Sequence, residues 1–169
     1  PVNEALTAMV KAITEREPAG PGVVRIDGAV VQPGSLTRAA LAQLPQDQHV
    51  EDISQLMPSM RGRAIRVNGL LDIPALAVDA DHVTFHSVDG KYAATLTLQQ
   101  ARDFGLLLYE LDGQPLPDGK GGPYRLVTPG LGDLCANVKA VGRIEVRAGS
   151  GKDTRPSVRP PECSTERSR

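Results

Sequence analysis

GGPYRLVTPGLGDLCANVKAVGRIEV, residues 121–146, carries the clearest structural pattern in this chain of 169 residues. It begins with a Gly-Gly-Pro step and continues into a predicted strand over residues 124–128. Pro129, Gly130 and Gly132 then break the chain into a loop. A last strand is predicted after this loop, because its apolar positions suit a sheet buried on one face. These positions are Val141, Ile144 and Val146.

Two cations flank the glycine-rich loop, because Arg125 lies in the first of these strands and Lys139 shortly precedes the second. Gly121 and Gly122 let the backbone approach a ligand closely and present free N–H groups to its oxygen atoms. The guanidinium and ammonium groups supply the countercharge. The segment therefore predicts a site for an anionic ligand. The alternative is a plain turn between two strands with two solvated cations.

The composition is that of an ordinary globular domain. Hydrophobic residues make up 40% of the chain and charged residues 23%, and the length fits one domain with its own core. The formal net charge of −1 gives no attraction to nucleic acid or to an anionic membrane, and 3% aromatic residues offer no base-stacking surface. With no signal peptide and no apolar run of about eighteen residues, a cytoplasmic protein is predicted.

Local patterns predict the other elements of the domain. A strand is predicted over residues 23–31, followed by a helix that Ser35 caps. The clearest hairpin spans residues 83–96 around an Asp-Gly turn, and a capping box at residues 97–100 opens a short helix. A further strand is predicted over residues 106–111. The apolar residues of the helix after Ser35 are Leu36, Ala40, Leu41 and Leu44.

Both ends of the chain differ from this central pattern. Residues 3–17 are predicted to form an amphipathic helix, because apolar residues recur at helical spacing. From Ala148 onward Ser, Pro, Gly and charged residues dominate, which predicts a flexible tail. The predicted organisation is therefore an N-terminal helix and linker over residues 1–20, a domain over residues 21–147 and a tail over residues 148–169.

Five segments, in this order and at this spacing, resemble the molybdopterin-binding domain of the sulfite oxidase family, including its small bacterial members. The resemblance covers roughly residues 23–146. It implies an α+β fold with mixed sheets, in a single domain to which the N-terminal helix is an extra element. It also implies a molybdopterin cofactor in a cleft lined by loops and strand ends. The segments are IDGAVVQPGSLT with the leucine-rich helix after it, VNGLLDI, VTFHSVDGKYAATLTLQQA, LLLYELDGQPL, and GGPYRLVTPG with NVKAVGRIEV.

The chain departs from this family at two positions. The family binds molybdenum through a cysteine thiolate shortly after the first helix, a soft anionic ligand suited to that metal. The corresponding residues 50–62 contain no cysteine, and the ligand position falls between Gln55 and Met57. Met57 and Met60 are neutral thioethers that cannot replace a thiolate, and their alternative role is packing on the domain. Lys120 stands where the family often has a histidine, and it can face an anion but cannot ligate as imidazole does.

Further residues near the implied cofactor complete the predicted site. Arg61 and Arg63 form a basic cluster with Arg66, for which a solvated face is the alternative. Cys135 and Asn137 lie in a loop that resembles part of the cofactor contacts of the family. Cys135 is either a substitute metal ligand or a small buried residue. The predicted cofactor-binding residues are Arg61, Arg63, Gly121, Gly122, Arg125, Cys135, Asn137 and Lys139; no metal site and no catalytic residue are assigned.

Three functions are compatible with these residues. The preferred prediction is a catalytically degenerate molybdopterin-binding domain that binds a pterin or another anionic small molecule, or that serves as an interaction module. One alternative is an active molybdenum-cofactor oxidoreductase with an atypical metal ligand. The other is a purely structural scaffold with a closed cleft. The cofactor implied is molybdopterin, whereas molybdenum is in doubt; a protein partner is predicted to bind the N-terminal helix, and neither nucleic acid nor a membrane is expected.

The binding and scaffold predictions differ in what they expect of the two cations. Binding places Arg125 and Lys139 in one pocket with Gly121, Gly122 and residues 55–63. The scaffold expects the two cations to form salt bridges to carboxylates instead. The carboxylates named for this role are Asp112 and Glu145.

Overall fold

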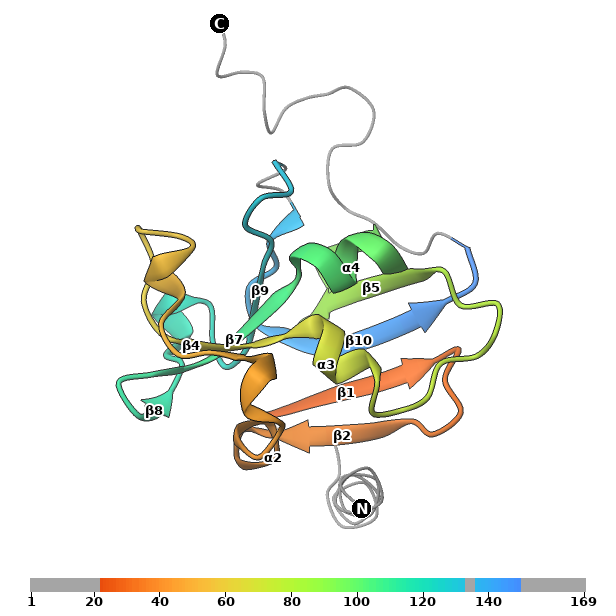
Figure 1. Ribbon diagram of the computed structural model, residues 1–169, viewed down its shortest axis with the longest axis horizontal. Helices are drawn as coiled ribbons and strands as arrows, with labels where there is room; N and C mark the ends of the chain where they lie inside the picture. The colour runs from red at the N-terminus through yellow and green to blue at the C-terminus, as the bar shows by residue number, and fades with distance from the viewer. Residues whose placement is uncertain (1–21, 133–135, 150–169) are drawn as a thin grey trace, which may run out of the picture.

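The computed structural model describes residues 22–132 and 136–149, which form two β-sheets and a few short helices (Figure 1). The predicted N-terminal helix, Cys135 and all but the first two residues of the predicted tail lie outside the described residues. Within the described ranges no helix is long and apolar enough to span a membrane. The helices are α2 (Arg38–Ala42), α3 (Val67–Leu71) and α4 (Leu98–Phe104), with 3₁₀ turns η1 (Gln46–Gln48), η2 (Ile53–Gln55) and η3 (Asp118–Lys120). The strands are β1 (Val23–Gly28), β2 (Gly34–Thr37), β3 (His49–Val50), β4 (Arg63–Arg66), β5 (His82–Ser87), β6 (Ala93–Thr97), β7 (Leu106–Leu111), β8 (Gln114–Pro115), β9 (Arg125–Val127) and β10 (Val141–Arg147).

The larger sheet has the strand order β2-β1-β10-β5-β6. It is mixed, because β1 and β10 run parallel while the other neighbouring strands are antiparallel. The register brings Ile26, Ile144, Phe85 and Ala94 into one row, which is buried on the face covered by α3 and α4 (Figure 1). Burial of each large apolar side chain in this row contributes about 1.5–3 kcal/mol. Residues one position along each strand face the opposite side of the sheet.

The smaller sheet has the order β3-β4-β7-β8, and β9 also pairs with β7. Strand β7 lies between two clusters of buried side chains: Leu107 and Tyr109 pack in the main core, whereas Leu108 belongs to a second cluster. Met57 and Met60 pack against this second cluster, which confirms packing on the domain as their structural role. The α+β class with mixed sheets that was predicted from the resemblance is therefore present in the described residues.

One predicted helix boundary is wrong. Ser35 does not cap a helix, because it lies in β2 and pairs with Arg25 of β1. The helix begins at Arg38 and its cap is Thr37. The Thr37 hydroxyl accepts a hydrogen bond from the backbone N–H of Ala40 at 3.2 Å. Strand pairing with β1 has thus extended residues 34–37, and such a long-range contact overrides the local preference of serine for a helix cap.

The predicted capping box at the start of α4 is confirmed. The Thr97 hydroxyl accepts from the N–H of Gln100 at 3.1 Å, and the Gln100 side chain accepts from the N–H of Thr97 at 3.1 Å. Thr97→Ala removes one of these bonds and is expected to lower the free energy of unfolding by about 1 kcal/mol. Urea denaturation measures this, with Thr97→Ser as the control that keeps the hydroxyl. An equal loss in both variants would show that strand packing, and not the cap, determines the effect.

Candidate functional site

A cavity of about 270 Å³ lies beside the Gly-Gly-Pro segment, at the ends of β7 and β9. We call it the Arg125 cavity. Three cations, Arg61, Lys120 and Arg125, border it together with an apolar wall. The other lining residues are Ser59, Met60, Leu108, Leu111, Leu116 and Gly119. The cavity therefore combines positive charge with apolar surface, as a site for a partly apolar anion requires.

Arg125 is the most buried of the three cations. It is half-buried, and burial lowers the pKa of its guanidinium group. One terminal nitrogen donates to the carbonyl of Lys120 at 3.2 Å, but the buried Nε has no partner. No carboxylate within the described parts of the chain pairs with Arg125. A buried donor without a partner costs free energy.

Gly121 brings the two predicted cations together. A Cβ atom at Gly121 would lie 2.7 Å from Cδ of Arg125 and 3.2 Å from Cγ of Lys139, and the φ angle of +93° also favours glycine. The absence of a side chain thus leaves room for both cationic stems. Lys139 is exposed, and it forms no salt bridge to any carboxylate that the structure describes. It lies beside the cavity and does not line it.

The carboxylates named by the scaffold prediction have other partners. Asp112 pairs with Arg61 at 2.6 Å on the protein surface. Glu145 lies on β10 and accepts from His86 and Arg147, both at 2.9 Å. Neither carboxylate contacts Arg125, so the salt bridges that a closed scaffold requires do not form between the residues seen in the structure.

The prediction of free N–H groups at the two glycines is wrong. The N–H of Gly121 donates to the carbonyl of Asp118, and the N–H of Gly122 donates to the carbonyl of Pro117, both at 2.9 Å. The reason is the 3₁₀ turn η3, which folds the chain back so that these amides are used within the segment. The two glycines therefore act through close packing, since a Cβ atom at Gly122 would lie 1.8 Å from the carbonyl oxygen of Leu116.

The remaining predicted site residues lie apart from the Arg125 cavity. Arg63 on β4 pairs with Glu51 at 3.1 Å, and its guanidinium lies 5.9 Å from the centre of the Tyr109 ring. Asn137 joins the two arms of its loop, because its side-chain oxygen accepts from the N–H of Thr128 at 3.1 Å and from its hydroxyl at 3.2 Å. Both side chains have structural partners, so their role in cofactor binding stays a prediction. The same holds for Cys135, which lies outside the described residues.

The chemistry of the donors suits an anion better than a metal. Both cysteines of the chain, Cys135 and Cys163, lie outside the described residues, so the sulfur atom that borders the cavity is the thioether of Met60. Residues 22–132 and 136–149 contain no group of three His, Cys, Asp or Glu side chains that could bind a metal ion. The described residues thus supply countercharge for a phosphate and no thiolate for molybdenum.

The sequence analysis did not identify the apolar wall of the cavity. Leu108 and Leu111 come from β7, whereas Leu116 follows the turn after it. Alternation along β7 predicts which residues share a face, but not which of them meet the loop after β8. That contact depends on the return of the chain through η3, for which the local sequence gives no clear signal.

Comparison with known proteins assigns the chain to a family. The family model of the oxidoreductase molybdopterin binding domain matches residues 59–154. This range includes every residue that lines the Arg125 cavity.

Individual relatives match shorter parts. The mitochondrial sulfite oxidase of Macaca fascicularis is 40% identical over 74 residues, which are 39% of this chain and 13% of that protein. The human mitochondrial sulfite oxidase is 39% identical over 74 residues, with the same coverage. The match thus spans about one eighth of these relatives. The crystal structure of the sulfane dehydrogenase SoxCD from Paracoccus pantotrophus is similar with a TM-score of 0.60 and 17% identity, covering 76% of this chain and 38% of that chain. At this identity the similarity shows the fold alone.

Proposed function

Because the chain belongs to the sulfite-oxidase-like family of oxidoreductase molybdopterin-binding domains, we propose that its Arg125 cavity binds the phosphate end of a molybdopterin or of a related pterin. The family binds this cofactor. The observation that carries the proposal is the half-buried guanidinium of Arg125, which has an unpaired Nε and no described carboxylate partner. A phosphate oxygen is the acceptor that such a group pairs with most strongly.

The other two cations add to the same site. Lys120 directly precedes the Gly-Gly-Pro step, and its carbonyl already accepts from Arg125. Arg61 is mostly exposed in its pair with Asp112, so it can exchange that carboxylate for a ligand at little cost. The volume of about 270 Å³ is slightly below the roughly 300 Å³ at which a pocket encloses a whole drug-sized ligand. The cavity therefore suits the phosphate end, with the pterin rings extending beyond it.

We assign the chain a binding role and not a complete oxidase site. A bound molybdenum cofactor supplies the redox chemistry, and the protein positions it and balances its charge. Arg125, Arg61 and Lys120 can do the second of these tasks. A metal-ligating thiolate would have to come from Cys135, from Cys163 or from another chain. An active oxidoreductase is therefore the second candidate, and it depends on a cysteine outside the described residues.

The content of the purified protein tests this proposal. The full chain is produced in a host that makes the molybdenum cofactor, molybdenum is measured by mass spectrometry, and pterin by its fluorescence after oxidation and denaturation. We expect close to one pterin per chain and far less molybdenum. Equal amounts of both would support the oxidoreductase, and Cys135→Ser would then be the next variant. Absence of pterin from a folded sample, as judged by circular dichroism, would contradict the proposal.

A further inference from the structure

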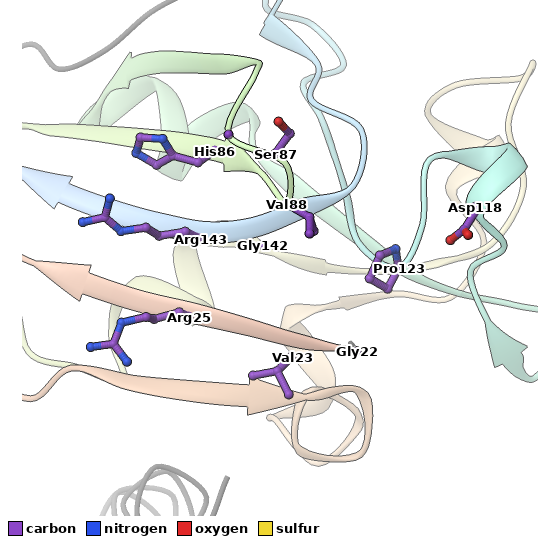
Figure 2. A pocket seen from close by; sticks show the side chains of 11 residues that line it. Gly22, Val23, Arg25, His86, Ser87, Val88, Asp118, Pro123, Gly142 and Arg143 are labelled. Atoms are coloured by element: carbon purple, nitrogen blue, oxygen red, sulfur yellow. The ribbon is translucent and has the colours of Figure 1, made fainter. Parts of the chain in front are cut away.

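A second and larger pocket, of about 760 Å³, lies on the face of the larger sheet opposite α3 and α4. We call it the outer pocket. Figure 2 shows Arg25 of β1 and Arg143 of β10 side by side at one end, and Pro123 and Asp118 at the other. Its volume is within the range of about 300–1,000 Å³ that is typical of small-molecule sites. The pocket shares no lining residue with the Arg125 cavity.

The cationic end of the outer pocket is held in a fixed arrangement by one carboxylate. Arg25 and Arg143 are neighbours in the parallel pair of strands, and two like charges at such positions repel each other. Asp27 offsets this repulsion, because it accepts from Nε of Arg25 at 2.8 Å and from Nε of Arg143 at 2.9 Å. The terminal nitrogens of Arg25 have no partner that the structure describes. The side chains of Arg25 and Arg143 are 44% and 42% exposed, so both can be reached by a ligand.

The charged side chains on this part of the sheet form one connected network. Three arginines, Arg25, Arg143 and Arg147, face two carboxylates, Asp27 and Glu145. Burial alone would raise the pKa of Glu145, but the hydrogen bond from His86 and the charges of Arg143 and Arg147 lower it overall. Glu145 is therefore ionised at neutral pH. Of these five groups only Arg25 and Arg143 line the pocket, so an anionic group at this end meets two guanidinium groups.

The other end of the outer pocket is mostly apolar, although Asp118 also lines it. Val23 precedes Arg25 by two residues on the same face of β1, so the two lie roughly 7 Å apart along the strand. Val88 is 65% exposed, and Gly142 packs closely against it, since a Cβ atom at Gly142 would lie 3.0 Å from Cγ2 of Val88. Pro123 completes the apolar surface.

We propose that the outer pocket binds a small amphiphilic monoanion, with its carboxylate or sulfonate on Arg25 and Arg143 and its apolar body against Val23 and Val88. Asp118, at the end away from the arginines, repels the anionic group and so favours one orientation (Figure 2). The proposal does not depend on the function of the Arg125 cavity. The two sites are nevertheless neighbours, because residues 118–125 contribute to the lining of both.

Octanoate is the probe that tests this inference, titrated into the full chain and followed by amide chemical shifts in NMR spectra. We expect saturable shifts at the amides of Val88, Gly142 and Arg143. Acetate has the carboxylate without the apolar body, and 1-octanol has the body without the charge. Each should bind at least tenfold more weakly than octanoate, because either lacks the contacts at one end of the pocket. Equal binding of octanoate and 1-octanol would overturn the proposal, as would shifts scattered over the domain.

Variants test whether octanoate binds at the outer pocket and not elsewhere on the protein. Arg143→Gln is expected to weaken octanoate binding about tenfold, and Val88→Asp, at an exposed position that keeps the fold, should weaken it at least as much. Arg102→Gln on α4 is the control for loss of an arginine elsewhere. Arg125→Gln should leave octanoate binding unchanged. Failure of the outer-pocket proposal can therefore be told apart from failure of the pterin proposal. If Val88→Asp shifts the amides of residues 1–21 without any ligand, those residues occupy the pocket and the inference is wrong.

Discussion

Arg125→Gln is expected to weaken binding of the pterin by a factor of about 10–100, which lowers the pterin content of the purified protein. The variant keeps a polar side chain but removes the charge that a phosphate would pair with, and a hydrogen bond to a charged group contributes about 1.5–3 kcal/mol. Pterin fluorescence after denaturation measures the occupancy. Calorimetric titration with inorganic phosphate then measures the loss of affinity for the anionic group alone.

The stability of the same variant distinguishes a binding role from a structural one. The Arg125 guanidinium is partly desolvated and has no described carboxylate partner, so its removal should leave the free energy of unfolding unchanged or raise it. Arg102→Gln is the matched control, because Arg102 is 28% exposed and bonds to Asn68 and Asp72. It should lower stability and leave pterin content intact. A loss of both stability and pterin in Arg125→Gln would indicate that Arg125 maintains the fold and does not bind the ligand.

Local patterns predicted those elements of the fold whose contacts are close in sequence. The hairpin of β5 and β6 follows from alternation on both sides of an Asp-Gly turn, and the start of α4 follows from four consecutive residues of the capping box. The cap of α2 could not be predicted in the same way. Ser35 and Thr37 are both good cap residues, and only the pairing of Ser35 with β1 decides between them.

In the candidate site, too, contacts between residues close in sequence were predicted and long-range contacts were not. Gly121, Arg125 and Lys139 come from one continuous segment, and the stems of the two cations both pass close to Gly121, but only Arg125 of the three lines the cavity. Arg61 and Arg63 border one further cavity together, but only Arg61 also borders the Arg125 cavity, which their closeness in sequence does not predict. The sequence also could not predict that Arg25 and Arg143 are neighbours, because this depends on the parallel pairing of β1 with β10. Alternation of apolar and polar residues predicts which face of a strand is exposed, but not which strand lies beside it.

Gly122→Ala is expected to cause the largest loss of stability among single substitutions in the Gly-Gly-Pro segment. The added Cβ atom would lie 1.8 Å from the carbonyl oxygen of Leu116 and 2.9 Å from that of Pro117. Both obstacles are main-chain atoms, so rotation of a side chain cannot relieve the overlap. Overpacking of this kind costs about 3 kcal/mol, which lowers the melting temperature by roughly 10 °C in a domain of this size. Thermal unfolding followed by circular dichroism measures the change.

Gly119→Ala is the control, because Gly119 lies in the same segment and a Cβ atom there meets no atom within 4 Å. Its stability should stay within about 0.5 kcal/mol of the unsubstituted protein. Residues 118–125 border both the Arg125 cavity and the outer pocket, so a backbone shift at Gly122 should weaken pterin and octanoate binding together. Arg125→Gln should affect pterin alone and Val88→Asp octanoate alone. If Gly122→Ala lowers stability but leaves both ligands bound as before, the segment supports the fold without shaping either site.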